Sequence, residues 1–279
     1  MVTVSQLYVY PVKSCGGISL ARAEVGRMGI RYDRQWMFAD DRGMFVAQRG
    51  RSSGDVGIEV RTLCLVGTTI TGDALVLTAP NMPPLHLPLD GPHGPSIDAQ
   101  VWDSHVTGVD QGAEADAWAT EYLSRERRGR YRLLRMSDDA DRAPKQGTGA
   151  LAYADAYSFL VIAEQSLADL NARLGHALPM NRFRPNLVLR GCAPYAEDDF
   201  ASIRIGDVLL DGTTRCLRCP IPTTNQETGE RGKEPLRTLA TYRRTPDGVV
   251  FGRNFNHRGT GMMSLGDTVI VSETHDDVA

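Results

Sequence analysis

Long apolar runs and a strong excess of either charge are both absent from this 279-residue sequence. The formal net charge is -3, so nucleic acid is not the default partner, because its polyanionic backbone selects basic proteins. No stretch reaches the length of a membrane-spanning helix. The start, M-V-T-V-S-Q-L-Y-V-Y, lacks the basic and apolar regions of a signal peptide. We therefore expect a cytoplasmic protein.

Cysteine and histidine are scarce as well. The five cysteines are an odd number spread over a long chain, which favours free thiols in a reducing compartment over a disulfide framework. A structural zinc site is disfavoured, because there is a single C-x-x-C pair and the six histidines form no H-x₃₋₅-H pair. Neither a P-loop motif nor a G-x-G-x-x-G after a strand is present. The acidic pairs Asp138-Asp139 and Asp198-Asp199 are interpreted as solvated loop charges.

The most informative stretch runs from Thr213 to Glu230, T-T-R-C-L-R-C-P-I-P-T-T-N-Q-E-T-G-E. Prolines within it remove amide donors and fix φ, so the segment is predicted to be an irregular loop. Its two cysteines, Cys216 and Cys219, are flanked by Arg215 and Arg218. A neighbouring arginine lowers a thiol pKa and favours the thiolate, which attacks electrophiles or binds metal. The possibility that one cysteine of the pair ligates a soft metal remains open.

A second candidate site follows the predicted strand Val2 to Tyr10. The segment P-V-K-S-C-G-G, Pro11 to Gly17, joins a lysine, a serine and two glycines. One interpretation is an anion cradle, in which the glycines turn backbone amides inward and Lys13 and Ser14 add a charge and a hydroxyl. The other interpretation is a surface turn with a solvated lysine.

Several arginines stand at predicted strand ends or turns. Arg34, Arg184, Arg215 and Arg218, together with Lys13, would form a site for a phosphate-bearing cofactor if they converge, because Arg presents a bidentate fork to phosphate. The alternative is that each pairs with a nearby carboxylate such as Asp33 or Asp155.

Short strands separated by Gly and Pro turns predict a β-barrel or sandwich in the first half, and the second half alternates more. Helices are expected over 113–128, over 166–174 with a Ser166/Asp169 capping box and a stop at Gly175, and from Glu234-Pro235. The fold class is therefore mostly β with α/β elements. Residues 137–149 are interpreted as a mobile loop and 90–95 as a rigid loop.

Taken together, seven segments in order resemble the MOSC-domain family with an N-terminal β-barrel domain. Its best-known members are the mitochondrial amidoxime-reducing component and bacterial reductases of N-hydroxylated bases. The segments are L-Y-V-Y-P-V-K-S-C-G-G, M-G-I-R-Y-D-R-Q-W, D-A-Y-S-F-L-V-I-A-E-Q-S-L-A-D-L-N, R-F-R-P-N-L-V-L, R-C-L-R-C-P-I-P-T-T-N-Q-E-T-G, E-P-L-R-T-L and F-G-R-N-F. The resemblance implies an N-terminal MOSC β-barrel domain at 1–120 and a MOSC β-barrel domain with flanking helices at 121–279.

The resemblance also implies a molybdenum cofactor, a pterin dithiolene with a phosphate tail (Mo-molybdopterin). Cys219 matches the family's cysteine ligand and is the implied catalytic and metal-binding residue. Arg218, from the cationic cluster next to it, is taken as a further cofactor-binding residue. The other implied cofactor-binding residues are Lys13, Ser14, Arg34, Asp155, Arg184, Asn186, Thr223, Thr224 and Asn254.

The implied activity is reduction of N-oxygenated substrates such as amidoximes or hydroxylamino bases. The chain ends at Ala279 without further cysteines, so we expect electrons from a separate flavin or iron–sulfur protein. Pro220-Ile221-Pro222 adds a residue relative to the family's pattern and is expected to reshape the substrate side. The alternative function is a cofactor or sulfur carrier without turnover, as in MOSC domains of sulfurases; we see no pyridoxal-phosphate domain of the sulfurase kind here.

Overall fold

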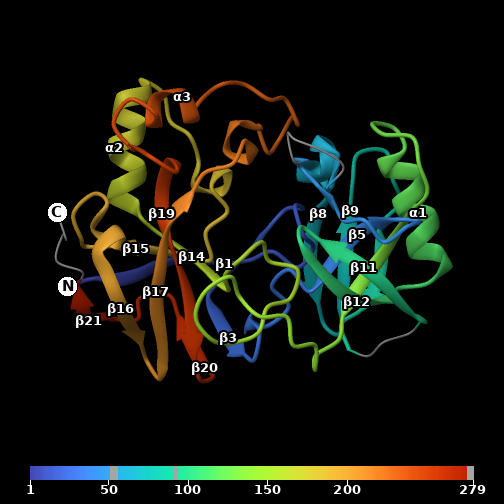
Figure 1. The fold of residues 1–279 in the computed structure, drawn as a ribbon, viewed down its shortest axis with the longest axis horizontal. Helices are drawn as coiled ribbons and strands as arrows, with labels where there is room; N and C mark the ends of the chain where they lie inside the picture. Colours follow the sequence, from blue (N-terminus) through green and yellow to red (C-terminus); the bar gives the residue numbers. More distant parts are fainter. Residues whose placement is uncertain (51–55, 91–93, 275–279) are drawn as a thin grey trace.

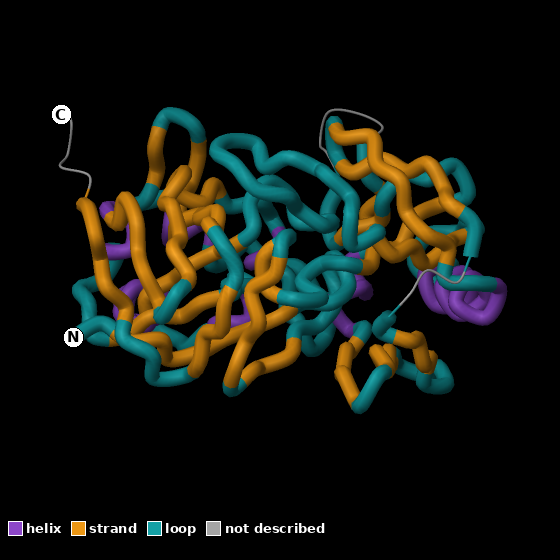
Figure 2. Tube along the Cα trace, turned by 90° about the horizontal axis from the view of Figure 1, so that it is seen from below, coloured by secondary structure: helices purple, strands orange, loops and turns teal. Residues whose placement is uncertain are grey.

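The computed structural model describes residues 1–50, 56–90 and 94–274, and part of the expected rigid loop at 90–95 lies outside them. Strands dominate, which confirms the expected mostly-β fold. Most of the first half of the chain lies to the right in Figure 1, and the second half lies to the left. Figure 2 shows helix α1 (Ala113–Leu123) at one end and the N-terminus at the other.

The largest sheet has nine strands and is built mainly from the second half. Its strands are ordered β2-β1-β15-β14-β19-β17-β16-β21, with β18 paired to β19. β1 is antiparallel to β15, and β14 is parallel to β15. The bounds are β1 Thr3–Val9, β2 Ile18–Leu20, β14 Phe159–Ala163, β15 Leu187–Arg190, β16 Phe200–Ile205, β17 Val208–Leu217, β18 Arg244–Thr245, β19 Gly248–Arg258 and β21 Val269–Thr274.

This sheet curves until its last strand meets its second. Thr3 and Thr268 form an antiparallel bridge, and the amide of Val269 donates to the carbonyl of Val2 at 2.9 Å. The curved sheet encloses a core of buried aliphatic and aromatic side chains that includes Leu7 and Phe255. Strand β1 therefore belongs to the structure of the second half, although it begins the chain.

Four smaller sheets complete the fold. β20 pairs with β3, so another early strand joins a late one. The four-stranded sheet β11-β12-β13-β5 packs with α1 over a core that holds Trp36 and Trp118. The bounds are β3 Arg22–Gly26, β4 Gly29–Ile30, β5 Trp36–Asp40, β6 Val46–Ala47, β7 Ile58–Glu59, β8 Gly67–Thr71, β9 Ala74–Thr78, β10 Leu85–Pro88, β11 Ser96–Val101, β12 Ser104–Asp110, β13 Tyr131–Met136 and β20 Gly261–Ser264.

Two of the predicted helices are shorter than expected, whereas the helix predicted at 166–174 begins two residues earlier, at Glu164. α1 ends at Leu123 rather than near residue 128, and it spans the expected division between residues 120 and 121. The helix after Pro235 is a single turn, α3 (Leu236–Leu239). Four 3₁₀ turns are also present: η1 Arg61–Leu65, η2 Met180–Arg182, η3 Ala196–Asp199 and η4 Ile221–Thr223. In the described part of the chain, no helix is both long and apolar enough to span a membrane.

Helix α2 (Glu164–Leu174) corrects the predicted capping box. The helix starts directly after β14 with Ala163 at its N-cap, so Ser166 lies inside it. The Ser166 hydroxyl instead lies 2.8 Å and 2.9 Å from the two carboxylate oxygens of Glu197. The predicted stop is confirmed, because Gly175 adopts the left-handed conformation at the C-cap (φ 73°).

The interpretation of Asp198-Asp199 as solvated charges is wrong for Asp198. Asp198 is buried, and its carboxylate pairs with Arg243 and lies 3.6 Å from Nε of Arg215. Burial of a carboxylate is tolerated where charged partners surround it. Asp198 therefore ties η3 to these two later arginines, whereas the side chain of Asp199 is half-exposed.

The buried carboxyl of Glu197 predicts how the stability of the protein depends on pH. The pKa of this carboxyl is raised from 4.5 to about 7 by burial, with the Ser166 hydrogen bond opposing. A raised folded-state pKa means that the native protein binds this proton more tightly than the unfolded chain does. The resulting stabilisation of the native state is present at pH 5 and is lost as pH rises through 7. We expect the unfolding free energy to fall by about 2 kcal/mol more between pH 5 and 8 in the wild type than in Glu197→Gln, measured by chemical denaturation.

A matched control is Glu126→Gln. Burial alone would raise the pKa of Glu126, but hydrogen bonds from the amides of Thr62 and Arg61 outweigh it and lower that pKa. Its contribution is therefore constant between pH 5 and 8, and Glu126→Gln should cost the same stability at both. An identical pH slope in wild type and Glu197→Gln would contradict the assignment.

Candidate active site: a cationic cavity with two thiols

A cavity of about 770 Å³ brings together most of the residues that the sequence singled out. It is bordered by the turn after β1, the segment before β14, the end of β17 and the middle of β19. The predicted residues that line it are Lys13, Ser14, Arg34, Asp155, Arg184, Asn186, Arg215, Cys216, Arg218, Cys219 and Asn254.

Lys13 is buried at the floor of this cavity. Its ammonium group donates to the carbonyl of Tyr153 at 2.8 Å and pairs with the carboxylate of Asp155. Burial lowers the pKa of Lys13, and Asp155 opposes this. Burial would raise the pKa of Asp155, but Lys13 and Arg49 outweigh it and hold that pKa well below its ordinary value. The surface-turn interpretation of residues 11–17 is therefore wrong.

The glycines of this turn do not form the predicted amide cradle. The amide of Gly16 donates to the carbonyl of Val66 at 2.8 Å, so it is not available to a ligand. Gly17 is required for another reason: a Cβ there would lie 2.4 Å from the ring of Tyr10. The glycines thus allow close packing of Tyr10, and the side chains supply the polar groups of the site.

Tyr10 organises two of the arginines. The guanidinium of Arg34 lies 4.6 Å from the centroid of the Tyr10 ring, and that of Arg184 lies 4.2 Å from it. The Tyr10 hydroxyl donates to the carbonyl of Pro185 at 3.1 Å, which ties the ring to the chain entering β15. Cation–π contacts of this kind strengthen when the groups are desolvated. Burial raises the pKa of Tyr10, with both arginines opposing, so it remains a neutral phenol.

Arg34 and Arg184 differ in whether a carboxylate neutralises their charge. Arg34 pairs with Asp33 and donates to Oδ1 of Asn186 at 2.9 Å. Arg184 is buried, donates to the carbonyl of Cys15, and has no carboxylate partner among the described residues. Burial lowers the pKa of Arg184. An uncompensated buried cation is costly, so this position favours an anionic ligand.

The backbone around the cavity is unusual. Ser14, Arg34 and Arg184 all adopt left-handed conformations, with φ of 67°, 49° and 58°. Such conformations are uncommon for residues other than glycine, and surrounding structure has to hold them in place. Three of them lining one cavity indicates that the fold aims these side chains at a ligand.

The two cysteines differ in their surroundings. Contrary to the predicted irregular loop, Cys216 belongs to strand β17, and Cys219 follows the end of that strand. Nη1 of Arg218 lies 3.1 Å from Sγ of Cys216, and its Nη2 donates to the carbonyl of Phe183 at 3.0 Å. Burial nonetheless raises the pKa of Cys216, with Arg218 opposing, which favours the neutral thiol over the predicted thiolate there. Cys219 is half-buried, and its thiol is free of any disulfide.

Three of the predicted residues have other roles. Arg215 lies at the cavity but pairs with Asp198 and Asp199. Thr223 and Thr224 lie behind the cavity wall: the Thr223 hydroxyl donates to the carbonyl of Pro220 at 2.7 Å, and the Thr224 hydroxyl accepts from Nε of Arg231 at 3.2 Å. They shape the turn η4, in which Ile221 faces the cavity.

The cavity as a whole is strongly cationic. Eight basic side chains line it against two acidic ones, Asp155 and Asp247. The basic residues are Lys13, Arg34, Arg49, Lys145, Arg184, Arg215, Arg218 and Arg253. Nε of Arg49, Arg218 and Arg253 is buried without a hydrogen-bond partner. The site is therefore suited to a multiply charged anion.

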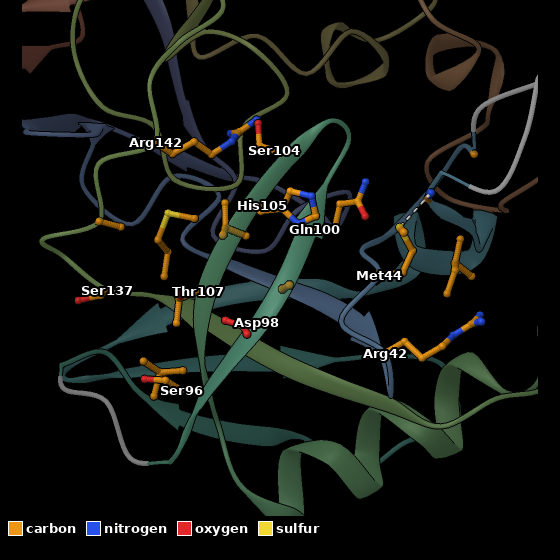
Figure 3. Close-up of a pocket in the computed structure, with 18 of the residues that line it drawn as sticks. Arg42, Met44, Ser96, Asp98, Gln100, Ser104, His105, Thr107, Ser137 and Arg142 are labelled. Atoms are coloured by element: carbon orange, nitrogen blue, oxygen red, sulfur yellow. Dashed lines mark hydrogen bonds between the residues drawn. The ribbon is translucent and has the colours of Figure 1, made fainter.

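Sequence reasoning missed several lining residues, including Arg49, Lys145, Tyr157 and Arg253. Arg49 and Lys145 stand in no recognisable motif, whereas Tyr157 and Arg253 lie within two of the seven segments that carry the family resemblance but were not singled out. The four residues meet only because distant segments converge. Arg49 is notable because it also lines a second, larger groove of about 2130 Å³. Figure 3 shows this groove along the hairpin of β11 and β12, with Gln100 and His105 on the hairpin and Arg142 beside Ser104.

Comparison with known proteins shows the family to which this chain belongs. Residues 1–126 match the MOSC N-terminal beta barrel domain, and residues 148–270 match the MOSC domain. The chain belongs to the MOSC-domain family. It is 35% identical to mitochondrial amidoxime-reducing component 1 of Mus musculus, over 96% of this chain and 81% of that protein. The Homo sapiens protein of the same name is 34% identical, over 96% and 82%.

A third MOSC relative, mitochondrial amidoxime reducing component 2 of Rattus norvegicus, is 33% identical over 96% of this chain and 82% of its own length. Across the described residues, no cluster of three or more His, Cys, Asp or Glu side chains that could hold a metal ion is present. The thiols at the cavity are those of Cys216 and Cys219.

The unpaired charge of Arg184 makes a prediction about anions. Inorganic pyrophosphate should stabilise the ligand-free wild type by about 2.7 kcal/mol at a concentration of 100 Kd, measured as a rise in the melting temperature. Arg184→Met should lose most of this effect while the ligand-free variant is as stable as wild type or more so, because the costly buried charge is gone. Arg190→Met, which removes an exposed arginine of β15, is the control. Equal pyrophosphate effects in both variants would contradict the site.

Proposed function

We propose that this chain is a molybdenum-cofactor-dependent oxidoreductase that reduces N-oxygenated substrates such as amidoximes or hydroxylamino bases. The observation that carries the proposal is one cavity that combines the Cys219 thiol with a large excess of cationic side chains. The relatives are named amidoxime-reducing components, which supports the same substrate class.

The residues present fit a pterin dithiolene with a phosphate tail. Lys13, Ser14, Arg34 and Arg184 would hold the phosphate, because charge-assisted and forked donors suit phosphate oxygens. Asn186 is almost fully buried and fixes Arg34 through its side-chain oxygen. Cys219 would supply a soft sulfur ligand to the metal. When bound, the cofactor supplies the two-electron and oxygen-accepting chemistry.

The net reaction defines what the protein has to supply. Cleavage of the N–O bond of an N-hydroxy group consumes two electrons and two protons, leaves an N–H group and releases water. We propose that the electrons come from a separate donor protein, a flavin or iron–sulfur reductase. The chain's own residues bind and orient: cationic groups hold the anion at the floor, and Leu217 and Ile221 provide apolar surface in the lining.

The thiol of Cys216 has a distinct role in this proposal. Because burial keeps its pKa raised, Cys216 carries a proton on Sγ at neutral pH, next to the guanidinium of Arg218. It therefore does not compete with Cys219 as a thiolate ligand. This separates the two cysteines of the C-x-x-C motif into one ligand and one neutral neighbour.

Metal content tests the assignment of Cys219. Protein made in a host competent for the cofactor should contain close to stoichiometric molybdenum, and Cys219→Ser should lose most of it, since serine is a hard and weakly acidic ligand. The measurement is elemental analysis of the purified protein. Cys192→Ser, at a half-buried free cysteine that does not line the cavity, is the matched control. Full molybdenum content and activity in Cys219→Ser would refute the assignment.

Turnover tests the substrate class. With a chemically reduced viologen as electron source, wild type should convert an aryl amidoxime to the amidine, and Cys219→Ser should lose roughly a hundredfold or more in kcat. The amidine is quantified by liquid chromatography. Stoichiometric molybdenum without any turnover of amidoximes or hydroxylamino bases would instead indicate a cofactor carrier.

A further inference from the structure

A hairpin from the first half of the chain reaches the cavity floor. Trp102 lies in the turn between β11 and β12, and its indole Nε1 donates to Oδ1 of Asp155 at 3.0 Å. Its backbone adopts a left-handed conformation with φ of 53°. This conformation is uncommon for a bulky residue and is stable only where the surrounding structure holds it. The turn thus adopts an unfavourable backbone conformation at Trp102, which places the indole against Asp155.

Arg49 meets the same carboxylate from another direction. Its Nη2 lies 3.5 Å from Oδ2 of Asp155, and its guanidinium lies 4.3 Å from the centroid of the Trp102 ring. The two carboxylate oxygens of Asp155 are therefore held separately, Oδ1 by Trp102 and Lys13 and Oδ2 by Arg49. About half of the Asp155 side chain is exposed (48%), so without these partners it would have room to rotate.

The backbone of Asp155 is held as well. The guanidinium of Arg142 donates to the carbonyl of Ala154 at 2.6 Å and to that of Asp155 at 3.2 Å. Phe45 packs edge-on against Trp102, with ring centroids 4.5 Å apart, and its ring lies 5.5 Å from the ammonium of Lys13. The carboxylate therefore has a fixed position relative to Lys13.

The fixed carboxylate of Asp155 also orients the ammonium group of Lys13. An ammonium group has three N–H donors, and two are used by Tyr153 and Asp155. One donor remains for a ligand in the cavity. The local charge also remains positive, because Lys13 and Arg49 share the single carboxylate of Asp155.

We propose that Trp102 and Arg49 are positioning residues for the bound cofactor: together they hold Asp155 so that Lys13 presents its free N–H to the phosphate. The inference rests on the proposed function, in which the cavity holds the pterin cofactor. It adds two residues that neither touch a metal ligand nor stand in any motif of the sequence, and it makes the β11–β12 hairpin part of the cofactor site.

The test compares Trp102→Phe and Arg49→Gln with matched controls. Trp118→Phe removes an indole N–H that donates to the carbonyl of Pro83 at 2.8 Å, away from the cavity. Arg42→Gln removes a groove arginine that pairs with Asp40. Molybdenum and oxidised pterin are measured per protein during extended dialysis. We expect Trp102→Phe and Arg49→Gln to lose cofactor roughly tenfold faster than wild type, the effect of one lost hydrogen bond to a charged group, and the controls to match wild type.

Two further variants separate positioning from general damage. Arg49→Lys keeps the charge and should retain the cofactor better than Arg49→Gln. In an Asp155→Asn background, Trp102→Phe should add little, because residues acting through one group are not additive. Loss rates for Trp102→Phe and Arg49→Gln equal to their controls, or a full Trp102→Phe effect in the Asp155→Asn background, would overturn the inference. Wild type without molybdenum or pterin would overturn the proposed function and this inference with it.

Discussion

A buried guanidinium, without a carboxylate partner in the described part of the chain, is the constraint on which the site depends. Arg184 stacks on Tyr10, and Tyr10 in turn packs on Gly17 and hydrogen-bonds to Pro185. The segment after β1 and the segment before β15 are thereby fixed against each other by one aromatic ring. Because burial of a lone charge is costly, the fold sacrifices stability here to keep a cation pointed into the cavity.

Burial and charge compete throughout the cavity, and the outcome differs from group to group. At Asp155 the neighbouring cations win, so the carboxylate stays ionised. At Cys216 burial wins over Arg218, so the thiol stays protonated. One side of the cavity thus holds a carboxylate between the cations of Lys13 and Arg49, and the other holds a neutral thiol beside the guanidinium of Arg218. A cofactor with a charged tail and a metal at its other end suits this polarity.

Much of the fold and the membership of the site could be predicted from local sequence. Strand β1 and the stop of α2 at Gly175 follow from residue types and spacing, and Lys13, Arg34 and Arg184, which the sequence singled out, do line one cavity. What failed depends on distant partners. Ser166 is not an N-cap because Glu197 takes its hydroxyl, and Asp198 is buried because arginines from later segments surround it. Arg49 carries no local signal at all; it matters only because the chain brings Asp155 and Trp102 to it.

The interleaving of early and late strands has a consequence for how the molecule is assembled. β1 pairs with β15 across at least 180 positions of sequence, with Leu7 opposite Leu187. β3 likewise pairs with β20, which comes near the end of the chain. Contacts so far apart in sequence slow folding, because the entropy of closing the loop is spent before they form. A ribosome-bound chain thus holds Lys13 and Ser14 early but has no complete cavity until β19 emerges, so an anion that needs the whole cavity can bind only when the polypeptide is nearly finished.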